Sequence, residues 1–455
     1  MSRSEWVNDD NAALFTDLYE LTMLQAYFVE EMTDDAVFDL FIRRLPERNY
    51  LLSAGLETVL TYLERLRFSE EAIAYLAGLD LFRDDFLEHL STFRFTGNVY
   101  AMAEGTPFFA DEPVLQVVAP IGEGQLVETF LLNQITFQTN LASKASRVVH
   151  AARGRAVADF GARRMHGTDA AVRGARAYHI AGVGMTSNVL AGHVFNLEVT
   201  GTMAHSYIEA YDYEADAFRA FAGLYPETTL LVDTYDTVEG VKRVIRLARQ
   251  TGLKIGAVRL DSGDLAELAH TSRRLLDEAD LEDVRIFASG SLDEYRITEL
   301  LDQKAPIDGF GVGTSMGTSA DQPYLDSAYK LCEYAGRPRM KLSSKKSNLP
   351  GLKQVFRFTG SDGRASHDVI GAMDENLGGQ PLLECVMRDG QRTAAGRRSL
   401  DDARAHAERS LQELPEQLLS IEPADPPYEV RLSDRLQSGL EKLRSELERR
   451  QQPDN

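Results

Sequence analysis

Short apolar runs alternate with helical segments between residues 155 and 312, and this alternation limits the possible folds more than any other feature. The runs are continuous rather than alternating in polarity, which is typical of strands buried on both faces of a parallel sheet covered by helices. Roughly seven strand–helix units in succession favour an irregular parallel α/β barrel, closed or nearly closed, over an open sheet. The predicted strands are residues 156–160, 180–184, 195–200, 229–232, 255–260, 284–288 and 307–312.

The segments on either side of this region predict an additional α/β domain. Helical spacing over residues 12–29 precedes a strand-like run over 36–42, and strand-like runs return beyond residue 324. We therefore divide the chain into three parts. They are an N-terminal α/β domain (1–135, completed by strands from about 325–400), the α/β barrel (136–324) and a C-terminal helical tail (400–455).

Charge and composition exclude several classes of partner. The 455 residues include 49 Lys and Arg against 70 Asp and Glu, a net charge of −21, which opposes binding to nucleic acid or an anionic membrane. The two cysteines do not form a metal-binding or disulfide pattern. The polar N-terminus does not resemble a signal peptide, and no apolar run is long enough to span a bilayer, so we expect a cytoplasmic protein.

The turn at residues 257–264 contains the densest group of candidate site residues. Arg259, Asp261 and Ser262 follow a buried strand, and a helix begins there with Asp261, Ser262 or Asp264 as its N-cap. An arginine, a carboxylate, a hydroxyl and a helix N-terminus together suit an anionic ligand that carries hydroxyl groups. We interpret this turn as the site of a phosphorylated ribose.

The other loops that follow predicted strands have the same character. In an α/β barrel these loops line one face and carry the ligand site. All of them are rich in Gly, Asp, Ser, Thr, Arg or His: residues 159–164, 201–206, 233–237, 289–293 and 311–315. Gly290 and the loop with Gly313 and Thr314 predict a phosphate cradle, since glycine lets backbone N–H groups approach oxygen closely. The alternative for each is a simple tight turn.

Three further side chains have a functional and a structural interpretation. His205 lies in a loop of small residues, where an imidazole can act as a nucleophile or proton carrier, although a single histidine is more often structural. Arg163 can pair with a carboxylate while Phe160 offers a stacking face; the alternative is a surface ion pair and a core aromatic. Tyr19, taken alone, fits the apolar side of its helix.

Five motifs in this order resemble those of the nicotinate phosphoribosyltransferases. They are DLYELTM (17–23), FGARR (160–164), GTMAHS (201–206), VRLDSGDL (258–265) and GVGT (311–314). The resemblance extends from about residue 11 to residue 360, and the tail beyond about residue 390 contains no motif that we can match. It implies the condensation of nicotinate with 5-phosphoribosyl-1-pyrophosphate (PRPP) to nicotinate mononucleotide and pyrophosphate, the first step of NAD salvage from nicotinate. It also implies ATP hydrolysis coupled to this reaction through a phosphohistidine.

The resemblance implies a role for each matching residue at the reacting end of the pocket. His205 matches the phosphorylated histidine, and Asp261 matches a carboxylate beside the ribose. Tyr19 and Phe160 match the aromatic pair that sandwiches the pyridine ring, with Tyr19 coming from the second subunit of a homodimer whose active site lies at the interface. Arg163 matches a contact to the nicotinate carboxylate.

Further matches complete the expected site. Thr202 and Arg259 match contacts at the nicotinate–ribose end, and Gly290, Gly313 and Thr314 match the pocket for the 5-phosphate. Mg²⁺ is the expected cofactor and ATP the co-substrate. Three acids are candidate ligands for Mg²⁺: Asp233, Asp261 and Asp264.

The prediction of nicotinate rather than nicotinamide as the substrate depends on a single position, residue 206. Nicotinamide-using relatives carry an acidic group that accepts from the amide, whereas Ser206 stands here near Arg163, which favours the acid substrate. A quinolinate-using enzyme would need more basic residues for a second carboxylate and would release CO₂. A non-catalytic barrel that binds a sugar phosphate is the alternative from another class of protein.

Overall fold

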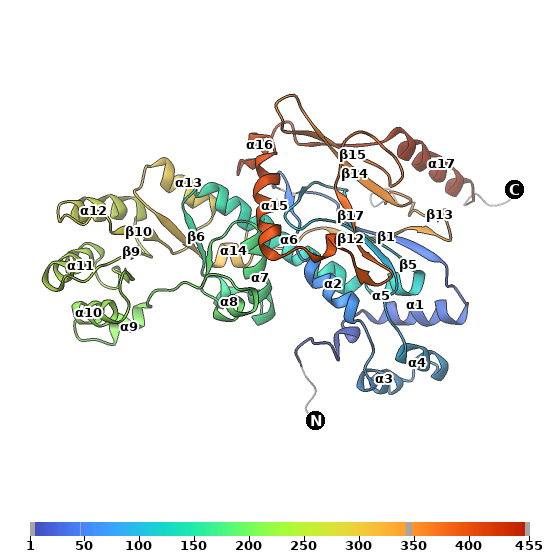
Figure 1. Ribbon diagram of the computed structural model, residues 1–455, viewed down its shortest axis with the longest axis horizontal. Helices are drawn as coiled ribbons and strands as arrows, with labels where there is room; N and C mark the ends of the chain where they lie inside the picture. Colours follow the sequence, from blue (N-terminus) through green and yellow to red (C-terminus); the bar gives the residue numbers. More distant parts are fainter. Residues whose placement is uncertain (1–4, 46, 343–347, 451–455) are drawn as a thin grey trace. The chain divides into compact units, whose positions relative to one another are not determined.

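The computed structural model describes residues 5–45, 47–342 and 348–450. The chain forms two compact units, one made of residues 1–140 and 324–455 and the other of residues 141–323 (Figure 1). Helix α6 (Glu128–Ala151) runs through the boundary without a break. None of the helices in the described part of the chain has both the length and the apolar character needed to cross a bilayer.

The second unit is built on a six-stranded, curled parallel sheet. Its strand order is β7-β6-β11-β10-β9-β8, and the helices between the strands lie along it (Figure 1). The strands are β6 (Ala156–Asp159), β7 (Met185–Thr186), β8 (Thr229–Leu231), β9 (Ala257–Leu260), β10 (Arg285–Ala288) and β11 (Gly309–Val312). The predicted α/β fold class with a parallel, irregular barrel sheet is therefore confirmed, with the barrel half-closed.

Two predicted strands are wrong, and both errors lie where the sheet stops short of closing. Helix α7 (Thr168–Ile180) extends into the first of them, 180–184, so that the strand is only Met185–Thr186. In the second, 195–200, helix α8 (Val189–Phe195) ends at Asn196 in the left-handed conformation, with φ 55°. Val199 then forms a single parallel bridge with Thr186 rather than a strand. Among the described residues, β7 and β8 form the two edges of this sheet.

Aspartates start the three helices that follow β8, β9 and β10. Asp236, Asp264 and Asp293 each accept a hydrogen bond from a backbone N–H in the first turn of α11 (Thr237–Thr251), α12 (Leu265–Asp277) and α13 (Glu294–Asp302). A side-chain oxygen at this position satisfies an N–H group that the helix leaves unpaired. The acids in these loops therefore include residues whose function is to fix where each helix begins.

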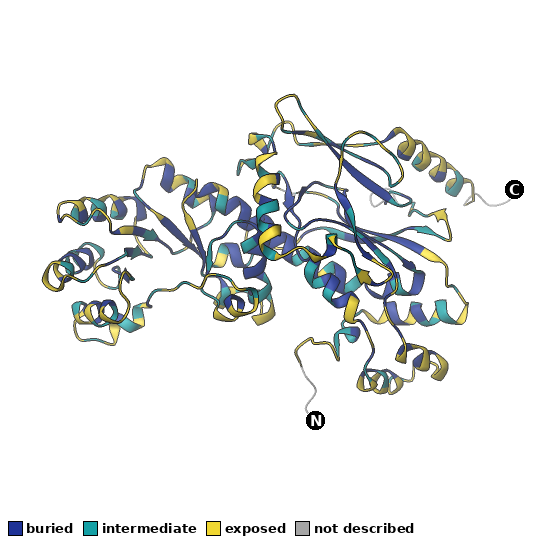
Figure 2. Ribbon diagram, in the orientation of Figure 1, coloured by how far each residue is buried: buried dark blue, intermediate teal, exposed yellow. Residues whose placement is uncertain are grey.

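The first unit contains a seven-stranded antiparallel sheet that joins segments from both ends of the chain. Figure 2 shows its strands buried and the helices exposed along their outer sides. In spatial order the strands are β13 (Arg337–Pro338), β12 (Ser327–Tyr334), β1 (Asp35–Ile42), β5 (Pro113–Pro120), β3 (Asn98–Met102), β17 (Leu383–Arg388) and β18 (Gln391–Arg392). Its helices are α1 (Leu18–Val29), α2 (Leu56–Arg65), α3 (Glu70–Ala77), α4 (Asp84–Ser91), α5 (Ile121–Leu126), α15 (Leu400–Gln412), α16 (Glu416–Leu419) and α17 (Asp434–Arg450).

A second, four-stranded sheet in this unit includes a strand from the predicted helical tail. Its order is β16 (Gln380–Pro381), β14 (Lys353–Thr359), β15 (Ala365–Ala372) and β19 (Glu429–Leu432), and β19 pairs with β15 in parallel. A buried ion pair joins the two sheets, with Lys353 Nζ on β14 lying 2.8 Å from Asp39 Oδ2 on β1. The tail is therefore part of the core structure rather than an appendage.

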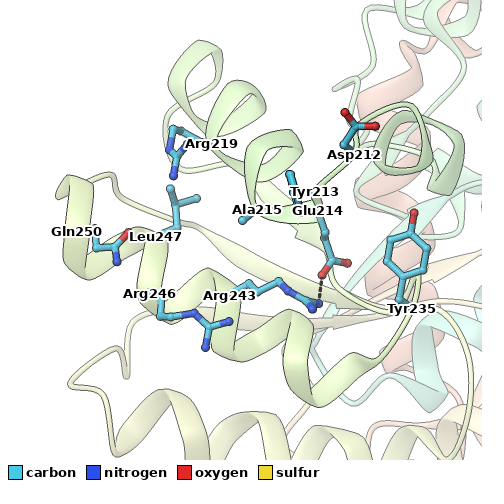
Figure 3. A pocket seen from close by; sticks show the side chains of 10 residues that line it. All are labelled: Asp212, Tyr213, Glu214, Ala215, Arg219, Tyr235, Arg243, Arg246, Leu247 and Gln250. Carbon is cyan, nitrogen blue, oxygen red and sulfur yellow. Dashed lines mark hydrogen bonds and ion pairs between the residues drawn. The ribbon is translucent and has the colours of Figure 1, made fainter.

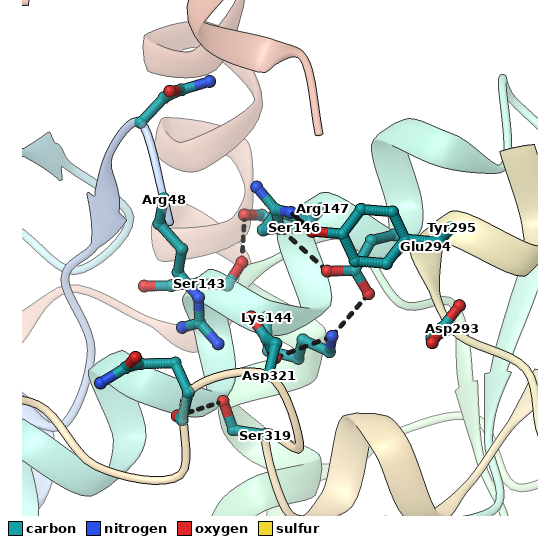
Figure 4. A network of polar contacts seen from close by, with 12 residues as sticks. Arg48, Ser143, Lys144, Ser146, Arg147, Asp293, Glu294, Tyr295, Ser319 and Asp321 are labelled. Carbon is teal, nitrogen blue, oxygen red and sulfur yellow. Dashed lines mark hydrogen bonds and ion pairs between the residues drawn. The ribbon is translucent and has the colours of Figure 1, made fainter. Parts of the chain in front are cut away.

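A buried charge network in the second unit fixes the start of helix α13 (Figure 4). Lys144 Nζ on α6 lies 2.6 Å from Glu294 Oε2 and 2.8 Å from Asp321 Oδ1. Arg147 Nε donates to Glu294 Oε1 at 2.9 Å. Glu294 is fully buried, so its charge depends on these two cations. Since Glu294 follows the loop that begins at Gly290, the network also holds that loop in place.

We expect Lys144→Met to lower the free energy of unfolding by about 3–5 kcal/mol, because it leaves the carboxylate of Glu294 partly uncompensated in the interior. Chemical denaturation measures this change. Lys242→Met is the matched control, since Lys242 forms its ion pair with Glu239 at 41% exposure. Loss of an exposed pair should cost less than about 1 kcal/mol. Equal losses in the two variants would contradict the proposed importance of the buried network.

Candidate functional site at the ends of the parallel strands

The predicted site residues of the second unit gather at one edge of the parallel sheet. Strands β6, β8, β9, β10 and β11 pair in parallel, so their carboxyl ends lie at the same edge. The pairing aligns Arg259 with Phe287 and Leu260 with Ala288. The residues that come next along each strand are therefore neighbours in space.

Arg259 is the centre of this cluster. Its guanidinium donates three hydrogen bonds, from Nε to Ser289 Oγ at 2.7 Å, from Nη1 to Thr202 Oγ1 at 3.0 Å and from Nη2 to Asp261 Oδ1 at 2.7 Å. The guanidinium carbon also lies 5.3 Å from the ring centroid of Phe160, which is a cation–π distance. Arg259 thus joins four segments that are far apart in the sequence. The side chain remains 14% exposed, so one face of it is open to a ligand.

Asp261 is held as a carboxylate beside this arginine. Its Oδ1 accepts from both Arg259 and the hydroxyl of Ser289. Burial opposes the ionised form, but the hydrogen bond from Ser289 and the charge of Arg259 outweigh burial and hold the pKa of Asp261 below its usual value. Asp261 is therefore ionised at neutral pH and supplies a fixed negative charge in the site.

His205 is the first residue of helix α9 (His205–Glu209), and its ring has a polar neighbour at each nitrogen. Nδ1 lies 3.1 Å from Thr234 Oγ1, and Nε2 lies 3.9 Å from Asp261 Oδ2. The side chain is 40% exposed. These contacts restrict the rotation of the ring while leaving it accessible to a reactant.

The three predicted magnesium ligands have different surroundings. Asp264 caps helix α12, and Asp261 is bound to Arg259. Asp233 Oδ2 accepts from the backbone N–H of Asp261 at 2.9 Å and from Ser262 Oγ at 2.7 Å, whereas its Oδ1 is buried and has no hydrogen-bond partner in the described part of the chain. Within residues 5–45, 47–342 and 348–450, three or more His, Cys, Asp or Glu side chains do not come together as a complete metal site. Asp233 is the acid with an unused oxygen.

Glycines permit close contacts between the loops of this edge. Gly290 has φ 87°, and a Cβ at this position would overlap the carbonyl oxygen of Asp261. A Cβ on Gly311 would collide with the ring of Phe160, so glycine allows that ring to lie across β11. A Cβ on Gly313 would come within 3.2 Å of the carbonyl oxygen of Phe160. Gly290 and Gly311 are therefore needed for packing, whatever ligand the loops bind, whereas the contact at Gly313 is only tight.

Four predicted site residues are not joined to the Arg259 cluster by any contact that the described chain shows. Arg163, in the 3₁₀ turn Ala162–Arg164, is exposed, as are Ser206 on α9 and Thr314 at the start of α14 (Thr314–Gly317). Tyr19 belongs to the first unit, on α1, and is 45% exposed. Burial and the nearby carboxylates of Glu128 and Glu20 raise the pKa of its phenol.

Sequence reasoning gave no role to two residues of the cluster, Ser289 and Thr234. Ser289 is the first residue and Thr234 the second after a predicted strand, within loops already identified as polar, and this position was the available signal. Ser289 bonds both Arg259 and Asp261, and Thr234 bonds His205. Hydroxyl groups of this kind orient charged partners, and their hydrogen-bonding partners cannot be read from position alone.

Three family models together match most of the chain. The nicotinate phosphoribosyltransferase N-terminal domain matches residues 14–136, and the C-terminal domain of the same family matches residues 375–440. The C-terminal domain of quinolinate phosphoribosyl transferase matches residues 141–322. The expectation that nothing beyond about residue 390 can be matched is therefore wrong, because most of the C-terminal match lies in that tail.

Individual relatives give the same result. A nicotinate phosphoribosyltransferase of Mycobacterium tuberculosis is 53% identical over 435 residues, covering 95% of this chain and 94% of the relative. One from Bacillus subtilis is 42% identical over 387 residues, covering 82% and 79%. The crystal structure of human nicotinic acid phosphoribosyltransferase superposes with a TM-score of 0.84 at 28% identity, covering 94% of this chain and 99% of the human chain. This chain belongs to the nicotinate phosphoribosyltransferase family.

Proposed function

We propose that the protein condenses nicotinate with PRPP to nicotinate mononucleotide and pyrophosphate, with ATP hydrolysis coupled to the reaction through phosphorylation of His205. The observation that carries this proposal is the convergence of Arg259, Asp261, His205 and Phe160 at one edge of the parallel sheet. This set combines a cation, a fixed carboxylate, an accessible imidazole and an aromatic face. Membership of the family supports the same reaction.

The bond-forming step needs positioning more than a nucleophile from the protein. The pyridine nitrogen attacks C1 of the ribose, and pyrophosphate leaves as the bond from C1 to oxygen breaks. Phe160 offers a face for the flat ring, and Arg163 lies exposed after it, where it can meet the carboxylate of nicotinate. Holding both reactants in line removes much of the entropic cost of their encounter.

Asp261 has a charge suited to this transition state. Loss of pyrophosphate leaves positive charge on the ribose ring, as at other glycosidic centres. A carboxylate that stays ionised at neutral pH stabilises this charge without having to reorganise as it develops. Arg259 and Ser289 keep Asp261 in that form. Thr202, on the other side of Arg259, completes the contacts at the nicotinate–ribose end.

His205 is suited to accept a phosphoryl group from ATP. Attack by an imidazole nitrogen on the γ-phosphorus releases ADP, and the ring proton passes to solvent. The phosphoryl group adds about two negative charges close to Asp261 and Arg259. This changes the local charge on which the binding of pyrophosphate and PRPP depends. We propose that ATP improves the yield of product in this way.

The residues present fit a magnesium ion that arrives with its substrate. Mg²⁺ is commonly held by one or two carboxylates together with phosphate oxygens and water, and the free Oδ1 of Asp233 is available for this role. The ion would neutralise charge on the leaving pyrophosphate. The loops with Gly290, Gly313 and Thr314 would then receive the 5-phosphate through their backbone N–H groups.

We also propose that the enzyme is a homodimer in which Tyr19 enters the pocket of the other subunit. Two side chains on α1 support this, since Leu18 is 51% and Tyr19 is 45% exposed although both are large and largely apolar. An exposed aromatic side chain at the start of a helix is available to cover a ring bound elsewhere.

The first test is the choice of substrate by the purified protein. With PRPP, ATP and Mg²⁺ we expect nicotinate to give its mononucleotide, and nicotinamide and quinolinate to give turnover lower by at least about a hundredfold. Chromatography of the products measures this, and trapping of CO₂ detects the quinolinate reaction. Turnover of quinolinate with release of CO₂ would replace the proposed activity. Binding of PRPP without turnover of nicotinate, nicotinamide or quinolinate would indicate a non-catalytic barrel.

We expect ATP labelled at the γ-phosphate to leave acid-labile label on the wild-type protein and none on His205→Ala. The physical reason is that the labile bond forms at the imidazole, which the variant lacks. His270→Ala is the matched control, since His270 is also exposed in the same unit but lies on α12. Label that persists in His205→Ala, or that disappears in the control, would contradict phosphorylation of His205.

Ser289→Ala should move the acid limb of the kcat/KM profile to higher pH. Ser289 is among the groups that hold the pKa of Asp261 below its usual value, so its loss raises that pKa, and the carboxylate becomes protonated earlier as pH falls. Ser291→Ala is the control, because Ser291 is exposed two residues later in the same loop. An unchanged acid limb in Ser289→Ala would mean that ionised Asp261 does not control activity.

A further inference from the structure

A cavity outside the Arg259 cluster lies between helices α10 (Glu214–Leu224) and α11 (Figure 3). Its volume of about 340 Å³ lies within the range of small-molecule sites. It is lined from α10, from the segment before α10 and from α11, with Tyr235 entering from the loop after β8. None of the roles proposed above uses these residues.

The cavity concentrates positive charge in an acidic protein. Arg219, Arg243 and Arg246 line it, whereas the chain as a whole carries a net charge of −21. Arg243 is paired with Glu214, and Arg219 forms an exposed ion pair with Asp216 at 2.9 Å. The guanidinium of Arg246 is exposed and has no ion pair within the described chain. A guanidinium in this setting suits a phosphate, which it can bind through two parallel hydrogen bonds.

Glu214 adds a buried acceptor that the protein itself does not satisfy. Its side chain is 2% exposed, and Oε2 accepts from Arg243 at 2.5 Å, as the dashed line in Figure 3 marks. Oε1 is buried and has no hydrogen-bond partner among the described residues. Burial raises the pKa of this carboxyl group, against the opposing effect of Arg243. An acceptor left unsatisfied in this way costs stability that a hydroxyl donor from a ligand would restore.

Two tyrosines also line the cavity. Tyr213 is 72% and Tyr235 is 63% exposed, so both rings are accessible to a ligand. Both rings line the cavity and are free to stack on a planar group. A free guanidinium, an unsatisfied carboxylate oxygen and exposed rings correspond to the three parts of a nucleotide: phosphate, ribose hydroxyl and base.

We propose that this cavity is a second binding site, which takes a nucleoside monophosphate. The phosphate is bound by Arg246, a ribose hydroxyl donates to Glu214 Oε1, and the base stacks on Tyr213 or Tyr235. The site is linked to the reaction centre by one peptide bond and one hydrogen bond, because Tyr235 follows Thr234, whose hydroxyl contacts His205 Nδ1. A ligand that restrains Tyr235 therefore also restrains the residue that orients His205.

The test is isothermal titration of adenosine monophosphate (AMP) into the full-length protein. We expect one AMP site that Arg246→Ala weakens at least about tenfold, since it removes a charge-assisted pair of hydrogen bonds. Arg249→Ala is the matched control, because it removes the same charge from the exposed side of α11 and should bind AMP as the wild type does. Turnover of nicotinate should be retained in both variants.

Two further titrations identify the ligand and separate this site from the Arg259 cluster. The double variant Tyr213→Ala/Tyr235→Ala should weaken AMP about tenfold and leave ribose 5-phosphate unaffected, because only AMP carries a base. Unchanged affinity for AMP in this variant would overturn the proposal. Arg259→Ala should still bind AMP. AMP binding that is lost in Arg259→Ala but kept in Arg246→Ala would place AMP in the reaction centre and overturn the proposal. Absence of AMP binding at millimolar concentration, or equal affinity for inorganic phosphate and AMP, would overturn it as well.

Discussion

The guanidinium of Arg259 is the interaction on which the rest of the site depends. It contacts a side chain just after β10, one from the loop before α9, one just after its own strand β9 and the ring that follows β6. A lysine could not replace it, because three donors in a fixed plane are needed to reach three oxygens at once. The parallel sheet brings these segments to one edge, and Arg259 determines how their side chains are arranged there.

The sequence was sufficient to predict the parallel sheet and the edge at which Arg259, Asp261 and His205 come together, because both follow from local patterns. Continuous apolar runs identify buried strands, and polar residues after them identify the ligand-binding edge. In the two segments that were wrongly predicted as strands, the apolar residues belong to the end of a helix and to a single β-bridge. Both give the same short run of apolar residues as a buried strand. Sequence also could not separate two uses of aspartate. Asp236, Asp264 and Asp293 cap helices, whereas Asp233 and Asp261 face the cluster. Whether an aspartate caps a helix or faces the cluster depends on the direction in which its side chain points, which the residue type does not specify.

The family models divide the chain in a way that bears on specificity. Residues 141–322 match a domain described for quinolinate enzymes, whereas the segments before and after match domains of nicotinate enzymes. A shared sheet can therefore supply the phosphoribosyl chemistry for more than one pyridine acid. The residues predicted to select the acid, Arg163, Ser206 and Tyr19, lie outside the Arg259 cluster. These are also the residues for which the described chain shows no contact with the cluster.

The contact between Gly290 and the carbonyl group of Asp261 has a consequence for how far the two turns can move. With no side chain between them, the turns after β9 and β10 touch through their backbones. Neither turn can therefore shift toward the other, and the buried ion pairs of Glu294 hold the segment after Gly290 in place. Under the proposed function, a sugar phosphate would bind to turns that are already ordered, so little conformational entropy of the protein would be lost on binding.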